Sequence, residues 1–361
     1  MAGGGSWYHR AAARDWVDTS AMPAARPFHE SLPDYAPTPL VSVPELADEL
    51  GVSAVHVKDE SARLGLPAFK VLGASWATAR VVSERTGSGT DLASLRRAAV
   101  SSGLRLVTAT DGNHGRAVAH MARLLGLEAT VFVPAVMTAR AADAIAAEGA
   151  DVVHTDGDYD SAVATAASFA DEEPARALVQ DTAWDGYEQV PAWIVEGYDT
   201  MFEEIDHQLG HAPDLVSVPV GVGSLAQAAV THYRRSGIGR PTVLSVEPDS
   251  AACLLASLVA GRPVTVDTGA TVMAGLNCGT VSSAAWPVLH AGCDAAVVVS
   301  DDSARRAVGD LVRLGVSSGP SGASSLAGVR AALVADRRAA LGIDRSSTLV
   351  LLSTEAAHDE A

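Results

Sequence analysis

The chain has 361 residues, of which 26 are Lys or Arg and 43 are Asp or Glu, so its formal net charge is −17 at pH 7. An acidic chain without a block of basic residues repels phosphates, which argues against nucleic acids and anionic membrane surfaces as partners. The 48% apolar content allows a large buried core, and the length suggests two domains or one large α/β unit.

The N-terminal 45 residues contain six prolines, and we expect them to run over the surface in extended form. From residue 54 onward, short apolar runs alternate with longer Ala-rich stretches of helical period, which is typical of an α/β fold. Because the runs are apolar throughout, they predict mostly parallel sheets flanked by helices. The expected strands are 54–57, 104–108, 129–133, 151–154, 178–180, 215–220, 242–246, 295–299 and 348–352. The expected helices are 115–125, 139–148, 161–169, 225–235, 304–314 and 325–341, and we expect a flexible loop at 83–90.

Lys58 and Lys70 are the only lysines, although the chain has 26 basic residues. A lysine amine can lose its proton and condense with a carbonyl, whereas arginine cannot. Lys58 precedes two acidic residues and is better explained as an ion-paired lysine. Lys70 follows Phe69 at the start of an apolar helix, where partial desolvation should lower the pKa of the amine. We therefore expect Lys70 to be functional.

A polar loop follows the strand expected at 104–108 and leads into a helix. Its sequence is Thr110-Asp111-Gly112-Asn113-His114-Gly115. Asp111 or Asn113 could simply cap the helix. The number of polar groups exceeds what a cap needs, so we also expect a site at this end of the sheet.

A glycine loop follows the strand expected at 215–220. It reads Gly221-Val222-Gly223-Ser224-Leu225-Ala226 and opens a helix, so its backbone N–H groups could bind a phosphate. The G-x-G-x-x-A spacing, with Glu247 at the end of the next strand, also fits a dinucleotide site. The loop predicts phosphate binding, and an NAD(P)-dependent oxidoreductase stays an alternative.

No apolar run reaches the ~18 residues that span a bilayer, and residues 1–16 show no export signal, so we expect a cytoplasmic protein. Cys253, Cys278 and Cys293 are too few and too scattered for a disulfide scaffold or a zinc site. We expect no metal, and a pairing of Cys253 with Cys278 stays open.

Several motifs together resemble the pyridoxal-phosphate enzymes of fold type II, the tryptophan-synthase-β type. Within this family the chain is most similar to diaminopropionate ammonia-lyases, in order from about Phe28 to Glu355. The motifs are Tyr35-Ala36-Pro37-Thr38-Pro39-Leu40, Lys58-Asp59-Glu60-Ser61, Ala68-Phe69-Lys70, the 110–115 loop, Thr155-Asp156-Gly157-Asp158-Tyr159-Asp160, Gln180-Asp181-Thr182-Ala183-Trp184, the 221–223 loop, Val246-Glu247-Pro248-Asp249 and 270–276.

The resemblance implies a cofactor, pyridoxal 5'-phosphate, and the residues that bind it. Lys70 would hold it in a Schiff base beside Phe69, and Asn113 would contact its ring hydroxyl. Gly221, Val222, Gly223, Ser224 and Leu225 would bind the phosphate, and Ser353 or Thr354 would face the pyridine nitrogen. It also implies a large cofactor-binding domain over 1–73 and 192–361, a small mobile domain over 74–191, and a homodimer.

The resemblance further implies α,β-elimination on 2,3-diaminopropionate, giving pyruvate and ammonia. Lys70 would remove the Cα proton of the L-isomer and Asp111 that of the D-isomer, with partial burial raising the pKa of Asp111. Asp181 would hold the β-ammonium group by a charge-assisted hydrogen bond.

Three positions depart from the family pattern: Pro320 replaces a glutamate, Thr280 another glutamate, and Ala356 a glycine. They leave two alternatives open. One is elimination or replacement on another β-substituted amino acid such as serine or threonine. The other is a non-catalytic relative that binds an amino acid.

Overall fold

The computed structural model describes residues 6–20, 23–235 and 239–357. The chain forms two compact units: unit 1 comprises Met1–Met22, Pro37–Ala62 and Met201–Ala361, and unit 2 comprises Pro23–Ala36 and Arg63–Thr200. The small domain predicted over 74–191 lies wholly within unit 2, which also includes residues 23–36, 63–73 and 192–200. Lys70 is therefore part of unit 2. The mobility of this unit stays a prediction.

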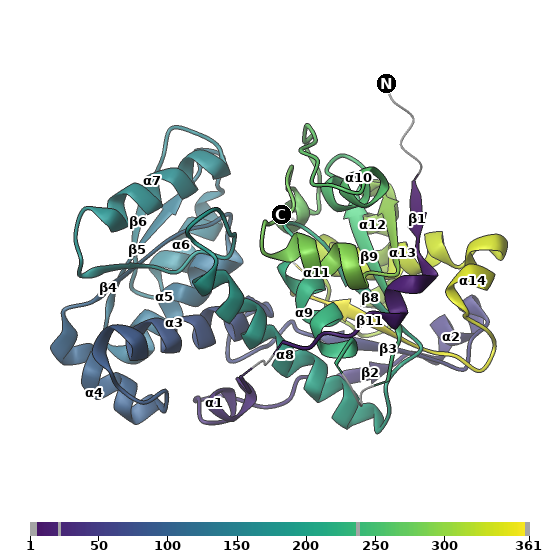
Figure 1. Cartoon of the computed structure of the whole chain (residues 1–361), viewed down its shortest axis with the longest axis horizontal. Helices are drawn as coiled ribbons and strands as arrows, with labels where there is room; N and C mark the ends of the chain where they lie inside the picture. The colour runs from purple at the N-terminus through teal and green to yellow at the C-terminus, as the bar shows by residue number, and fades with distance from the viewer. Residues whose placement is uncertain (1–5, 21–22, 236–238, 358–361) are drawn as a thin grey trace. The chain divides into compact units, whose positions relative to one another are not determined.

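Unit 1 contains a seven-stranded sheet in the order β1-β10-β9-β8-β11-β3-β2 (Figure 1). The five central strands run parallel, and the edge strands β1 and β2 run antiparallel to their neighbours. The central strands β8, β9 and β11 are almost wholly buried, as apolar runs predict for a covered sheet. The strands are β1 Trp7–His9, β2 Leu40–Ser42, β3 Ala54–Asp59, β8 Leu215–Pro219, β9 Thr242–Pro248, β10 Ala295–Val299 and β11 Thr348–Ser353.

The helix α13 (Pro320–Ala332) packs closely against this sheet because it is built from small residues. A Cβ on Gly328 would lie 2.2 Å from Val246 Cγ2, so glycine is required at that position. Leu326 of α13 and Leu351 of β11 belong to the same apolar core. The helix α8 (Gln189–Leu209) begins in unit 2 and ends in unit 1. The other helical segments of unit 1 are η1 Ala11–Asp15, α2 Pro44–Leu50, α9 Ser224–Tyr233, α10 Cys253–Ala260, η2 Ala274–Leu276, α11 Ala285–Gly292, α12 Asp301–Arg313 and α14 Ala335–Leu341.

Unit 2 contains a four-stranded parallel sheet in the order β6-β5-β4-β7 (Figure 1). Alanines of α7, at a spacing of four residues, pack against Val107 and Phe132 of the sheet. Its strands are β4 Arg105–Ala109, β5 Glu128–Val133, β6 Asp151–His154 and β7 Arg176–Leu178, and its helices are α1 Arg26–Glu30, α3 Lys70–Thr86, α4 Leu92–Ser102, α5 Asn113–Leu125, α6 Ala139–Ala146 and α7 Tyr159–Asp171.

The predicted fold class and all nine predicted strands are confirmed, and the strand ends shift by at most two residues. Three expectations were wrong in part. The Pro-rich N-terminal segment contributes β1 and β2 as edge strands. The helix expected over 325–341 is two helices, because Val334 adopts an extended backbone between them. Residues 83–86 belong to α3 and not to a loop.

Within the part of the chain that the structure describes, every helix is either too short or too polar to cross a bilayer.

Candidate active site

Lys70 is the first residue of α3, and Phe69 holds the cap position before it. Close packing against α8 fixes this helix end. A Cβ on Gly197 would lie 2.4 Å from Leu72 O, and the rings of Phe69 and Tyr198 have centroids 4.8 Å apart. The amine of Lys70 therefore projects from a rigid support, at the start of an apolar helix as the sequence predicts.

Lys70 Nζ donates a hydrogen bond to Asp181 Oδ2 at 2.5 Å, with 23% of the Lys70 side chain and 8% of the Asp181 side chain exposed. Burial alone would lower the pKa of Lys70. The negative charge of Asp181, helped by Tyr198 and Asp111, outweighs it and raises this pKa above its usual value. The expectation of a lowered pKa was thus wrong, because the sequence does not show which carboxylate faces the amine.

Asp181 follows β7 and accepts hydrogen bonds on both oxygens. Its Oδ1 accepts from the Tyr159 hydroxyl at 3.3 Å and from Gln180 Nε2 at 3.2 Å. Burial would raise the pKa of Asp181, but His114, Lys70 and these hydrogen bonds hold it well below its usual range. Because burial lowers the pKa of His114 and keeps its ring neutral, we assign most of this effect to Lys70.

The polar loop after β4 is anchored by the Thr110 side chain. Thr110 Oγ1 accepts the backbone N–H groups of Gly112 at 2.9 Å and of Gly115 at 3.0 Å. A Cβ on Gly115 would lie 2.3 Å from Thr110 Cγ2, so glycine is required there. The cap residue of α5 is Gly112, not Asp111 or Asn113 as simple capping would require.

Asp111 is exposed and Asn113 is half-buried. The surrounding protein raises the pKa of Asp111 by partial desolvation, and the Lys70 ammonium opposes this rise. The predicted direction of the pKa shift is confirmed, whereas the predicted burial of the side chain was wrong. Asp111 lies close enough to Lys70 and Asp181 for their charges to change its pKa, which places it in the same cluster.

The sequence-based prediction omits three groups that surround Asp181: His114, Tyr159 and Gln180. His114 is buried, and its Nε2 donates to Val179 O at 2.8 Å. Gln180 Nε2 also donates to the Tyr159 hydroxyl at 2.9 Å. All three lie within motifs that resemble the family, and nothing else in the sequence marks them as site residues.

In unit 1, the glycine loop between β8 and α9 is shaped to hold an anion. Gly223 has φ +105°, and a Cβ there would lie 2.8 Å from Leu289 Cδ1. A Cβ on Gly221 would lie 3.0 Å from Gly275 O. The cap of α9 is Gly223, which offers no side-chain acceptor to the N–H groups of the first turn, and such a helix N-terminus suits an anion. The loop therefore fits the phosphate of the expected cofactor.

Glu247 has a different role from the one a dinucleotide site requires. It is fully buried, and its two carboxylate oxygens accept the backbone N–H groups of Leu254 and Leu255, each at 2.7 Å. Glu247 thus holds the start of α10 and is not available to a ribose. This removes one of the features that favoured an oxidoreductase.

Ser353 and Thr354 lie buried at the end of β11, and Ser353 Oγ donates to Ser317 O at 3.1 Å. The departure at Pro320 is nearby in the same unit. Pro320 is the first residue of α13, a position that suits proline, and the preceding Gly319 N–H donates to Glu355 O at 3.0 Å. The replacement of a glutamate by Pro320 is therefore compatible with the local backbone.

Lys58 is an ion-paired lysine, as predicted. Its fully buried amine donates to Glu204 Oε2 at 2.7 Å, Thr38 O at 2.8 Å and Gln208 Oε1 at 2.9 Å. A primary ammonium has three donors, and these acceptors match that number.

The described residues contain no disulfide, so Cys253 and Cys278 are thiols in this structure. Cys253 is buried beside the glycine loop, with Sγ 3.7 Å from Gly221 O, and burial raises the pKa of its thiol.

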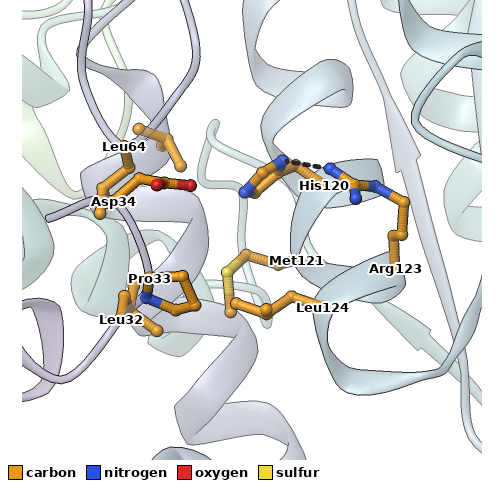
Figure 2. A pocket seen from close by; sticks show the side chains of 9 residues that line it. Leu32, Pro33, Asp34, Leu64, His120, Met121, Arg123 and Leu124 are labelled. Atoms are coloured by element: carbon orange, nitrogen blue, oxygen red, sulfur yellow. Dashed lines mark hydrogen bonds between the residues drawn. The ribbon is translucent and has the colours of Figure 1, made fainter.

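Unit 2 also has a cavity of about 160 Å³ with mixed walls (Figure 2). Apolar side chains line it together with Asp34, His120 and Arg123, and the Asp34 carboxylate points toward the His120 ring. Arg123 donates to His120 Nδ1 at 3.1 Å. Val71 lines the cavity, but none of the predicted site residues does, so the cavity is separate from the cluster around Lys70.

Comparison with known proteins identifies a family and several relatives. Residues 32–355 match the family of pyridoxal-phosphate dependent enzymes. The diaminopropionate ammonia-lyase of Salmonella typhimurium is 40% identical over 280 residues, which is 73% of this chain and 68% of that protein. The diaminopropionate ammonia-lyase of Escherichia coli is 35% identical over 351 residues, which is 92% of this chain and 87% of that protein.

Solved structures agree with this result. The Escherichia coli diaminopropionate ammonia-lyase in complex with D-serine superposes with a TM-score of 0.86 at 31% identity, covering 97% of this chain and 93% of that one. The same enzyme with an aminoacrylate-PLP azomethine reaction intermediate gives a TM-score of 0.85 at 32% identity, with the same coverage. The chain therefore belongs to the pyridoxal-phosphate dependent enzymes, in the fold-type-II group that includes its diaminopropionate ammonia-lyase relatives.

Proposed function

We propose that this chain is a diaminopropionate ammonia-lyase, which converts 2,3-diaminopropionate to pyruvate and two molecules of ammonia by α,β-elimination. One observation carries the proposal: the amine of Lys70 donates to Asp181 at 2.5 Å, beside the carboxylate of Asp111, which also raises the pKa of Lys70. This cluster offers one amine as a base and two carboxylates that can bind the amino groups of a diamino acid. The relatives that bear this name support the same reaction.

Pyridoxal 5'-phosphate, when bound, supplies an aldehyde for the substrate's α-amine and a conjugated ring that accepts electron density from Cα. We propose that Lys70 holds this group, with Phe69 beside it. Asn113 would bind the ring hydroxyl. Residues 221–225 would bind the phosphate through their N–H groups, and Ser353, or Thr354 next to it, would face the ring nitrogen. Because a hydroxyl is neutral, this ring nitrogen would not be held protonated, which suits prompt elimination.

Lys70 must lose its proton before it can accept one from Cα. In the structure, Asp181 stabilises the ammonium form of Lys70. A substrate β-ammonium group that pairs with Asp181 would take over this ion pair, and burial would then lower the pKa of Lys70. Binding of a cationic substrate therefore favours the neutral, basic form of Lys70.

Asp111 would serve as the base for the D-isomer and Lys70 for the L-isomer. A carboxyl with a raised pKa is a better base than an ordinary one near neutral pH. The raised pKa of Asp111 supports this assignment. Asp181 would bind the β-ammonium group by a charge-assisted hydrogen bond in both cases.

Serine and threonine are the second candidate substrates, since a related structure was solved with D-serine. They carry a neutral β-hydroxyl, which would form a weaker hydrogen bond with the Asp181 carboxylate than an ammonium group would. The departures near Pro320 motivate another alternative, a relative that binds an amino acid without turnover. We place the protein in the cytoplasm, as a homodimer, on the resemblance to its family.

The test is a measurement of ammonia and pyruvate release by the purified holoenzyme. D- and L-diaminopropionate, serine and threonine are compared at equal concentration. We expect the highest kcat/KM for diaminopropionate, with two ammonia molecules per pyruvate. Faster turnover of serine would support the second candidate, and bound cofactor without ammonia release would support the binding protein.

A further inference from the structure

The His114 ring has a fixed tautomer. Its Nε2 lies 2.8 Å from Val179 O, and a carbonyl oxygen can only accept, so Nε2 carries the proton. Burial lowers the pKa of His114, and the ring is therefore neutral. In this state Nδ1 has a lone pair and acts only as an acceptor.

Nδ1 of His114 is buried and has no hydrogen-bond partner among residues 6–20, 23–235 and 239–357. Only 1% of the side chain is exposed. A buried polar atom without a partner costs free energy, so such atoms are uncommon in folded proteins. Asp181 Oδ2 lies 3.8 Å from this nitrogen, which is too far for a hydrogen bond.

Two acceptors therefore lie 3.8 Å apart: His114 Nδ1 and Asp181 Oδ2. Neither can donate to the other while His114 is neutral and Asp181 is ionised. A nitrogen about 2.9 Å from each would fit between them and could donate to both. The amine of Lys70 already occupies the Asp181 side of this place.

We propose that His114 Nδ1 accepts an N–H group of the substrate's β-ammonium, beside Asp181, and that His114 thereby sets the preference for a β-amino over a β-hydroxyl substrate. This inference rests on the function proposed above. An ammonium group has three donors and can satisfy both acceptors. A hydroxyl has one donor and can supply only one of these two acceptors, so His114 Nδ1 and Asp181 Oδ2 cannot both bind it, which sites of this kind penalise strongly.

Two variants separate this role from simple support of the backbone. His114→Gln can keep a donor to Val179 O but has no acceptor at the Nδ1 position. His114→Asn places an amide oxygen near the Nδ1 position but cannot reach Val179 O. We expect H114Q to lower kcat/KM for diaminopropionate about 10- to 100-fold, with less than about a threefold change for serine. H114N should keep most of the preference for diaminopropionate over serine.

A structural role predicts the reverse. If H114Q kept the wild-type preference and H114N lost it, His114 would only support Val179, and the inference would be overturned. Failure of the wild-type enzyme to release ammonia from diaminopropionate would instead overturn the proposed function. The two failures are therefore distinguishable.

A second measurement does not depend on turnover. In the holoenzyme with ¹⁵N-labelled histidine, the Nδ1 resonance of His114 is assigned as the one missing from H114Q. The probes are 1,2-diaminoethane and ethanolamine, which differ only in the second polar group and lack a carboxylate. We expect the diamine to move the Nδ1 resonance upfield by clearly more than ethanolamine does. Equal shifts with the two probes, or none with either, would contradict the inference.

Discussion

Lys70 and Asp181 form a close ion pair, with Nζ and Oδ2 2.5 Å apart, although 111 positions separate them in the sequence. The pair joins the start of α3 to the segment that follows the strand β7. It stabilises the ammonium form of Lys70, so a change at Asp181 should alter both substrate binding and the basicity of the amine.

Replacement of Asp181 by Asn should lower the pKa of Lys70, because the charge that raises it is removed while burial, which lowers it, remains. The chain has only two lysines, and Lys58 is fully buried, so reductive ¹³C-methylation of the cofactor-free protein should give one main lysine signal to titrate by NMR. Asp143→Asn, on the exposed face of α6, is the matched control and should leave this pKa unchanged. Equal lysine titration curves for D181N and wild type would contradict the ion pair.

The same Asp181→Asn variant should bind diaminopropionate less well. Loss of a charge-assisted hydrogen bond costs about 1.5–3 kcal/mol, so we expect KM to rise by at least about tenfold. Steady-state kinetics at saturating cofactor checks this value. An unchanged KM would mean that Asp181 does not hold the β-ammonium group.

Asp111→Asn should affect the two enantiomers differently. A general base contributes about 10²–10⁴-fold to the rate, so turnover of D-diaminopropionate should fall at least about 100-fold. Turnover of the L-isomer, for which Lys70 is the base, should change only a few-fold and serves as the internal control. Separate assays of the pure enantiomers measure both rates. If both fell equally, the assignment of two bases would be wrong.

Gly223→Ala should weaken binding of the cofactor's phosphate. The new Cβ would lie 2.8 Å from Leu289 Cδ1, at a backbone φ of +105°. Gly261→Ala is the matched control, because Gly261 has a positive φ of +66° and nothing within 4 Å of the new Cβ. We expect G261A to lose about 1 kcal/mol of folding free energy at unchanged cofactor affinity. G223A should need at least about tenfold more pyridoxal 5'-phosphate for half-saturation in a fluorescence titration.

Comparable cofactor affinities for G223A and G261A would show that the 221–225 loop does not bind the phosphate.

Much of the fold could be predicted because most of its central strands are buried on both faces. Uniformly apolar runs such as 215–220 and 348–352 mark β8 and β11 clearly. The edge strands β1 and β2 could not be found in this way, since each has three residues and is only partly buried. The break between α13 and α14 was also missed, because both sides of Val334 continue the same Ala-rich composition.

The site was predictable where chemistry restricts the residue type. Lys70 stands out because, apart from Lys58, every other basic position of the chain is arginine. Asp181 could be named only through the family resemblance, since its contact with Lys70 depends on tertiary structure. The orphaned Nδ1 of His114 could not be predicted at all, because it follows from the tautomer that Val179 O imposes.

The most direct test of the central claim is borohydride reduction of the purified holoenzyme, followed by peptide mass spectrometry. We expect the reduced cofactor on the peptide that contains Lys70, and no modification of Lys58, which is fully buried. Lys70→Arg, which keeps a positive charge near Asp181 but cannot react with the aldehyde, should abolish the adduct and the visible absorption band. A colourless wild-type protein, or a reduced adduct at any residue other than Lys70, would contradict the account.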